Sequence, residues 1–69
     1  MKTINTSLQI TSNNQRLYTV SYTTTETDIQ LIIDALTNYL QIIYENEHIK
    51  LNQDNMQYLG NGKYSFWYL

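Results

Sequence analysis

Cysteine and proline are both absent from this 69-residue chain, and glycine occurs only twice. Without cysteine the chain has no disulfide and no thiolate metal site. His48 is the single histidine, so we expect no metal and no cofactor. A chain this short buries only about 60% of the surface that its unfolded form exposes, and its stability is marginal without a further contribution. Association is the contribution that this composition leaves open.

Positive charge is scarce, and the formal net charge is −2. The four basic residues are scattered along the chain: Lys2, Arg16, Lys50 and Lys63. Affinity for nucleic acid depends largely on clustered Lys and Arg that neutralise phosphates. The composition therefore argues against nucleic-acid binding, and an acidic surface fits a basic protein partner instead.

Long apolar runs are also missing. No segment approaches the roughly 18 consecutive apolar residues that a membrane-spanning helix needs. The N-terminus carries one lysine and no apolar stretch of the kind found in a signal peptide. With no cysteine present, these features predict a cytoplasmic protein that does not contact a membrane.

What the chain does contain begins with two alternating segments, residues 2–11 and 16–23, which predict a β-hairpin. A two-residue loop would pair Ile10 with Leu17 and send the two apolar sets to opposite faces. A loop of three or five residues pairs Ile10 with Tyr18 and gathers both sets on one face. Because a one-residue slip moves every side chain to the other face, we favour the odd-length loop.

A helix follows, with Thr25 as the expected N-cap and Asp28 three residues later, although Thr24 is an equally fair cap. We expect it to run to about Asn46, which is roughly twenty residues. One stripe is apolar and is predicted to face the sheet: Ile29, Ile32, Ile33, Leu36, Tyr39, Leu40, Ile43 and Tyr44. A second stripe is polar: Gln30, Asp34, Thr37, Asn38, Gln41 and Glu45.

Three further apolar residues, Leu31, Ala35 and Ile42, lie between these stripes. They widen the apolar arc to roughly 220°, well beyond the ~100° that covers one sheet face. A wide arc predicts a second neighbour for the helix. Whether that neighbour is another protein or more of this chain stays open.

The C-terminal part predicts a second hairpin around Gly60-Asn61-Gly62. A three-residue loop with Gly62 in the left-handed region pairs Tyr58 with Tyr64, whereas a two-residue loop mixes the two faces. The three-residue loop is favoured because it gathers one apolar face: Met56, Tyr58, Tyr64, Phe66 and Tyr68. It leaves the opposite face to Gln57, Ser65, Trp67 and Leu69. Whether His48–Leu51 forms a further strand stays open.

The expected fold class is therefore α+β. It has an antiparallel sheet of four to five strands, in the order hairpin, helix, then two or three strands. One long amphipathic helix packs on one face. Residues 1–69 are expected to form a single domain.

Catalytic chemistry finds little support in the sequence. His48 is the only side chain that serves as a base near neutral pH, and a lone histidine near a helix end is usually solvated. Four carboxylates are expected on the polar helix face or in loops, where solvation is the default: Asp34, Glu45, Glu47 and Asp54. Both glycines belong to one turn, so no glycine-rich phosphate loop exists. We therefore predict no enzymatic activity.

Protein binding has better candidates. The partner-binding residues that we predict are apolar but not needed by the expected core: Leu31, Ala35, Ile42, Trp67 and Leu69. Tryptophan is enriched at the energetically dominant positions of interfaces. A symmetric homodimer is the commonest arrangement for a self-complementary patch. The few charges and the lack of proline also leave strand edges open to pairing.

No motif identifies a family. In size, acidity, tyrosine content and order of elements, the chain resembles the small proteins that phages and mobile elements encode. The resemblance implies an inhibitor that occludes a basic groove of host defence or replication machinery. We therefore predict a non-enzymatic, homodimeric protein-binding module that inhibits a host defence or nucleic-acid-processing enzyme. One alternative is a homodimeric structural or adaptor subunit, and another is a tyrosine-rich nucleic-acid binder that stacks on bases.

Overall fold

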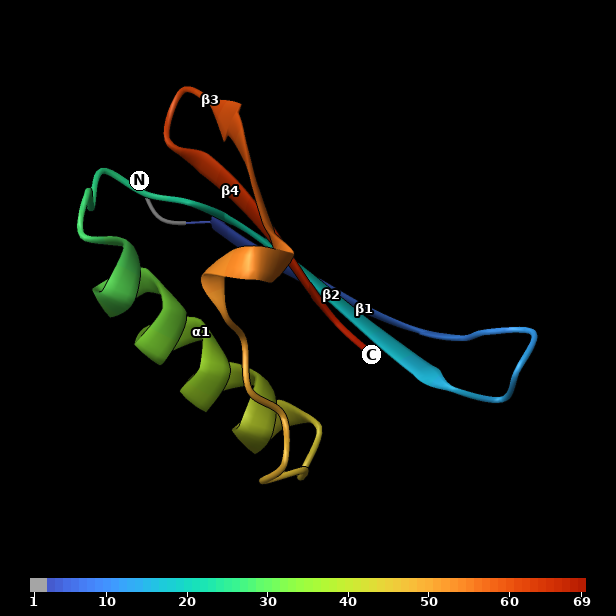
Figure 1. Ribbon diagram of the computed structural model, residues 1–69. Coiled ribbons are helices and arrows are strands. Elements are labelled where there is room, and N and C mark those ends of the chain that lie inside the picture. The colour runs from blue at the N-terminus through green and yellow to red at the C-terminus, as the bar shows by residue number, and fades with distance from the viewer. Residues whose placement is uncertain (1–2) are drawn as a thin grey trace.

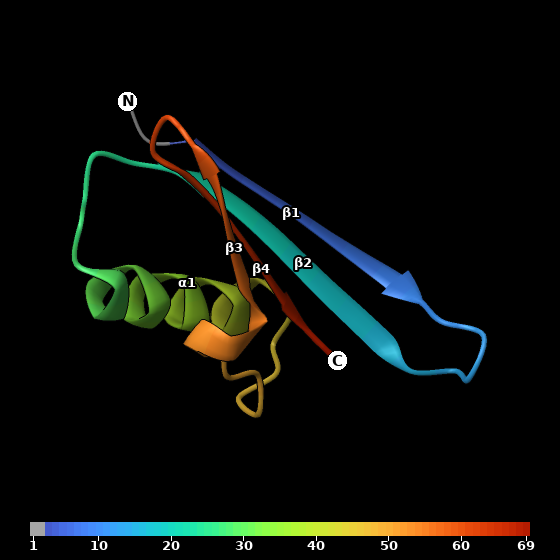
Figure 2. The same cartoon turned by 45° about the horizontal axis from the view of Figure 1, so that its top comes forward.

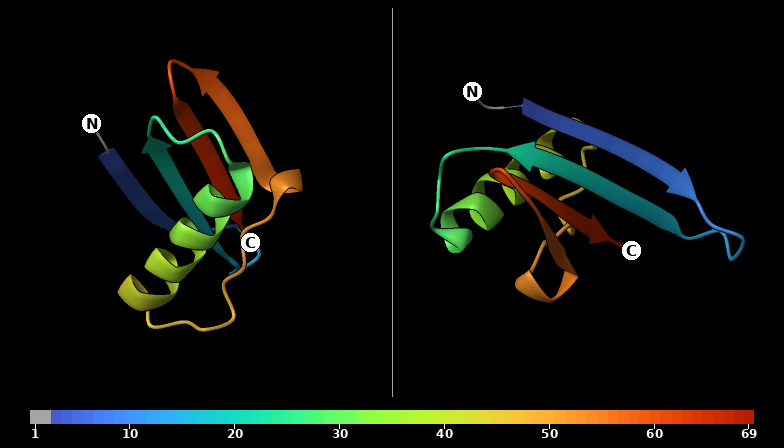
Figure 3. Two further views of the ribbon diagram at one scale, coloured as in Figure 1. Left: turned by 90° about the vertical axis from the view of Figure 1, so that its left-hand side faces the viewer. Right: turned by 90° about the horizontal axis from the view of Figure 1, so that it is seen from above.

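The computed structural model describes residues 3–69, which form a four-stranded antiparallel sheet and one long helix (Figure 1). The elements in chain order are β1 (Thr3–Ile10), β2 (Arg16–Thr23), α1 (Ile29–Ile43), the 3₁₀ turn η1 (Gln53–Asn55), β3 (Met56–Gly60) and β4 (Lys63–Tyr68). The sheet order is β1-β2-β4-β3, and α1 lies on one face (Figure 3). The predicted α+β class and order of elements are confirmed.

The β1–β2 hairpin has a five-residue loop, so the predicted odd length is confirmed. Its register differs from the predicted one by two residues, because Ile10 pairs with Arg16 and Leu8 pairs with Tyr18. The loop closes where the Thr11 N–H donates to the Gln15 carbonyl at 2.8 Å. Pairing between β2 and β4 ends at Tyr18 and Tyr68, so the hairpin extends beyond the rest of the sheet as an arm (Figure 1).

The β3–β4 hairpin has the predicted pairs, Met56 with Phe66 and Tyr58 with Tyr64. The tyrosine rings pack with centroids 4.8 Å apart. A tight turn at Asn61 and Gly62, both with positive φ (55° and 77°), joins the strands, and a register shift between Tyr58 and Gly60 compensates for its short length. The loop thus has two residues rather than the predicted three, because Gly60 pairs with Lys63, but the shift preserves the predicted pairs.

The helix begins later than predicted, because Asp28 is its N-cap and accepts a hydrogen bond from the Gln30 N–H at 3.0 Å. Thr25 is not the cap. The Thr24 hydroxyl accepts from the Glu26 N–H at 3.0 Å, which stabilises the turn ahead of the helix. α1 is fifteen residues long rather than roughly twenty, and its C-cap is Tyr44.

The core lies between α1 and the inner face of the central strands. Helix residues Ile32, Ile33, Leu36 and Leu40 are buried there, together with Tyr18, Val20 and Tyr22 of β2 and Tyr64 and Phe66 of β4. Residues 48–51 are not a strand, but they contribute Ile49 and Leu51, which are 0% and 2% exposed. The sheet therefore has no fifth strand at residues 48–51, and this segment is a loop whose apolar side chains pack in the core.

Two hydrogen bonds hold this loop against the polar stripe of α1. The Gln41 amide donates to the Ile49 carbonyl at 2.8 Å, and the Leu51 N–H donates to the Thr37 hydroxyl at 3.2 Å. The polar stripe of α1 is thus partly covered by the loop. Its side chains at Thr37 and Gln41 supply hydrogen-bond partners for the backbone of the loop. The opposite flank of α1 has no such cover in the part of the chain that is described.

Candidate protein-binding site

The uncovered flank of α1 is apolar. Its exposed residues, which we call the α1 shoulder, are Leu31, Ala35, Tyr39, Ile42 and Ile43. Leu31 and Ile42 are 54% and 65% exposed, as the wide arc predicted for residues outside the core. Tyr39 and Ile43 were predicted to face the sheet, but they are 38% and 42% exposed. The loop through Ile49 and Leu51 covers the other flank of α1, at Thr37 and Gln41, and leaves Tyr39 and Ile43 uncovered.

The inner face of β1 extends the apolar surface. Leu8 and Ile10 lie on the helix side of the sheet, since they share a face with Tyr18, yet they are 41% and 62% exposed. The helix covers β2 and β4, whereas the arm of the hairpin projects past it (Figure 2). The alternation in the sequence predicted which face of the sheet these side chains occupy. It could not predict their exposure, because that depends on how far α1 extends over the hairpin.

A depression of about 180 Å³ lies between the start of α1 and the sheet. Its lining includes Leu31 and Ala35 of the shoulder, Tyr22 of β2 and Glu26. Tyr22 pairs with Ile4 of β1. The loop through Ile49 and Leu51 binds the other flank of α1 on its way to η1 and β3, so the shoulder faces the β1 side of the sheet (Figure 3).

The other two predicted partner-binding residues lie on the opposite face of the sheet. Trp67 pairs with Thr19 on the face away from α1 and is 37% exposed, and Leu69 follows β4 and is 60% exposed. The structure therefore divides the predicted set. Leu31, Ala35 and Ile42 lie together on α1, and Trp67 and Leu69 lie at one end of the outer face.

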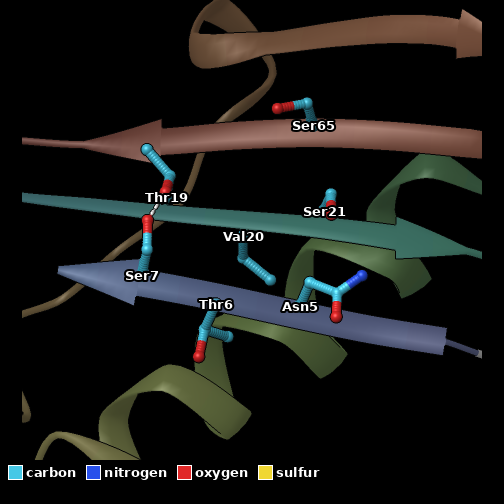
Figure 4. Close-up of a pocket in the computed structure, with 7 residues that line it drawn as sticks. All are labelled: Asn5, Thr6, Ser7, Thr19, Val20, Ser21 and Ser65. Atoms are coloured by element: carbon cyan, nitrogen blue, oxygen red, sulfur yellow. Dashed lines mark hydrogen bonds between the residues drawn. The ribbon is translucent and has the colours of Figure 1, made fainter.

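The outer face also holds a shallow depression of about 290 Å³ over β1, β2 and β4 (Figure 4). Small polar side chains dominate its lining: Asn5, Ser7, Thr19, Ser21 and Ser65. The hydroxyls of Ser7 and Thr19 are hydrogen-bonded to each other across neighbouring strands (Figure 4). No charged or basic group lines the hollow, so it offers neither a general base nor a counter-charge for a ligand.

The residues considered for catalysis do not form a common site. His48 is exposed, and only its backbone is engaged: its N–H donates to the Asn46 side chain and its carbonyl accepts from the Tyr68 hydroxyl at 2.9 Å. Asp34 accepts from the Gln30 amide at 2.9 Å on the exposed helix face. Among residues 3–69, no three His, Asp or Glu side chains gather as metal ligands.

Tyrosines serve mainly in the core. Tyr18, Tyr22 and Tyr64 are buried, and Tyr44 and Tyr68 pack against the core. The Tyr18 ring packs edge-on against Tyr44 with centroids 4.9 Å apart, and its hydroxyl accepts from the Asn46 amide at 3.4 Å. These rings are therefore not free to stack on bases.

The acidic side chains lie in one part of the chain, on α1 and the segments that flank it. All six acidic residues lie between Glu26 and Asp54, outside the four strands, and all are exposed. None of them belongs to the α1 shoulder. Thr3–Ile10, the whole of β1, carries no charge.

No protein-family model, curated protein or solved structure matches the chain. No helix within residues 3–69 has the length and apolar character required to cross a bilayer.

Proposed function

We propose that this chain is a non-enzymatic protein-binding module that acts by covering the surface of another protein. The observation that carries the proposal is the uncovered α1 shoulder, which continues onto the inner face of β1. Exposed apolar residues that cluster next to each other mark interaction surfaces in small proteins. This cluster is bounded by polar residues of α1, such as Asn38 and Asp34, as an interface core is bounded by a polar rim.

The acidic residues support a basic partner. Six exposed carboxylates on α1 and the segments that flank it attract a positively charged surface and speed the encounter with it. Basic grooves are the working surfaces of nucleic-acid-processing enzymes, including those of host defence. We therefore propose inhibition of such an enzyme by occlusion as the role of the module.

The second candidate is a homodimeric structural or adaptor subunit, which uses the same apolar surface without inhibiting anything. Binding of nucleic acid through stacked tyrosines is less well supported, because Tyr18, Tyr22 and Tyr64 are buried in the core. Arg16 and Lys63 also lie in different strands and do not replace a basic groove.

The test compares Ile42→Asp with Gln57→Asp, two variants that each add one negative charge at an exposed position, the first on the α1 shoulder and the second on β3. Tagged wild-type protein and both variants are used to capture proteins from a lysate of the source organism. Each captured protein is then purified and its affinity measured directly at two salt concentrations. We expect Ile42→Asp to abolish binding, Gln57→Asp to retain it, and added salt to weaken it. Equal binding by all three proteins, or no interaction with any protein including the chain itself, would contradict the proposal.

A further inference from the structure

We propose that a second copy of this chain occupies the α1 shoulder, by antiparallel pairing of the two β1 strands. The proposal rests on the proposed function, because it names a second copy of the chain as the protein that this surface binds first, and the dimer then presents the exposed acidic residues of both copies to a basic partner. Two copies related by a two-fold axis perpendicular to the sheet would form one continuous eight-stranded sheet. Both helices would then lie on the same face of it, with their shoulders turned toward the axis.

The two edges of the sheet differ in a way that selects β1. β1 is an edge strand of eight residues, uncharged and without proline, and within residues 3–69 it pairs only with β2. β3, at the other edge, is five residues long and has a register shift between Tyr58 and Gly60. Short length and bulges are the devices that protect an edge from pairing, and β1 lacks both.

The register of the pairing follows from the two faces of β1. Directly opposed residues lie on the same face, so the apolar inner face is preserved only when opposed residue numbers add to an even number. Pairing centred on Ser7 meets this condition and opposes Ile4 of each copy to Ile10 of the other. It also uses both exposed apolar residues of the arm, since Leu8 then lies opposite Thr6.

This register brings the arm of one copy to the depression of the other. Ile4 pairs with Tyr22 within its own chain, and Tyr22 lines the depression with Leu31 and Ala35. An Ile10 opposed to Ile4 therefore lies at the entrance of that depression. By symmetry the contact occurs twice, so each arm covers part of the other copy's α1 shoulder.

The exposed apolar residues of the shoulder and β1 supply part of the area that a stable dimer buries. Six large apolar residues of this surface are each between 38% and 65% exposed, which together equals about three fully exposed residues and, with the area of each taken near the lower end of the roughly 150–250 Å² of an aromatic side chain, is on the order of 500 Å²: Leu8, Ile10, Leu31, Tyr39, Ile42 and Ile43. A standard interface buries about 800 Å² per partner. The backbone and polar side chains along β1 supply the remainder.

Sedimentation equilibrium from low to high micromolar concentration tests the proposal. We expect wild-type protein to reach twice its chain mass of 8.2 kDa. Ser7→Lys places two like charges opposite each other at the axis, and Ile42→Asp places a charge on the shoulder, so both should sediment as monomers. Gln57→Lys makes the matched change at an exposed position of the other edge strand and should remain dimeric. Circular dichroism verifies that each variant is folded.

A wild-type chain that stays monomeric at the highest concentration overturns the inference. If that monomeric wild-type chain binds a different protein and Ile42→Asp does not, the proposed function survives without the dimer. A dimer that dissociates in Gln57→Lys but not in Ser7→Lys also overturns the inference, because the pairing edge would be β3. A wild-type chain that neither self-associates nor binds any other protein contradicts the proposed function itself.

Discussion

Two adjacent aromatic residues in β4 have opposite environments. Phe66 is 0% exposed beneath α1, whereas Trp67 lies on the outer face opposite Thr19. Phe66→Ala leaves a cavity in the core and should cost about 3–5 kcal/mol of unfolding free energy. Trp67→Ala should cost less, about 1–3 kcal/mol, because Trp67 is already 37% exposed. Urea denaturation of both variants measures the difference, and equal losses would show that Trp67 belongs to the core.

The two glycines of the β3–β4 turn provide a matched pair. Both have positive φ, but a Cβ at Gly62 would lie 2.5 Å from the Thr24 carbonyl oxygen, whereas one at Gly60 would have nothing within 4 Å. Gly60→Ala should therefore lose about 1–2 kcal/mol, the cost of the left-handed backbone alone. Gly62→Ala should lose about 1–3 kcal/mol more, because the clash forces the end of β2 away from the turn.

Thermal unfolding of the two glycine variants checks this order. The Thr24 N–H donates to the Gly62 carbonyl at 2.9 Å, so the same clash should expose that amide to hydrogen exchange. A Gly62→Ala variant as stable as Gly60→Ala would mean that the contact between the turn and Thr24 is not close in solution.

At the scale of elements, the C-terminus of α1 has a non-glycine residue where glycine is usual. Glu45 has φ of 52°, the Glu45 N–H donates to the Ile42 carbonyl at 3.3 Å, and the Asn46 N–H donates to the Gln41 carbonyl at 3.1 Å. This is the Schellman pattern of bonds, in which glycine avoids the cost of a left-handed Cβ. The negative charge of the Glu45 carboxylate is also unfavourable there, because the C-terminal end of the helix dipole is negative.

Glu45→Gly should therefore stabilise the chain by about 1 kcal/mol. Glu45→Ala removes the charge but not the Cβ, so it should gain only about 0.3 kcal/mol or less. Denaturant unfolding of both variants separates the two contributions. A destabilised Glu45→Gly would contradict the described end of α1.

The strands were predictable because alternation of apolar and polar residues depends only on the backbone. It gave the faces of all four strands and the pairs of the β3–β4 hairpin. The register of β1 and β2 was two residues off, since it depends on the loop hydrogen bonds at Thr11 and Gln15. The ends of α1 were also missed, because several residues before it compete to accept the same N–H groups.

The candidate site was predictable in part for a similar reason. Helical spacing identified Leu31, Ala35 and Ile42 as surplus to one sheet face. It could not identify Tyr39, Ile43, Leu8 and Ile10, whose exposure depends on which flank of α1 the loop through Ile49 covers and how far the hairpin arm projects. The weak alternation at residues 48–51 was the only local signal for that loop.

At the scale of the whole molecule, a small core is combined with a large uncovered apolar surface. A domain of this size has only a few kcal/mol of stability, and burial of the α1 shoulder in a dimer would add to it. The urea midpoint of wild-type protein should therefore rise with protein concentration. The midpoint of Ser7→Lys should not change, and a concentration-independent wild-type midpoint would indicate that the folded monomer is the stable unit.

The most direct test of the account is disulfide capture at the two-fold axis. The chain has no cysteine, so a single Ser7→Cys substitution provides the only thiol in each copy. Opposed strand residues have Cα atoms about 4.5–5.5 Å apart, within the range that a disulfide spans. Under mild oxidation we expect Ser7→Cys to form a covalent dimer far faster than Gln57→Cys, an exposed control on the other edge. Equal rates for the two variants would contradict pairing through β1.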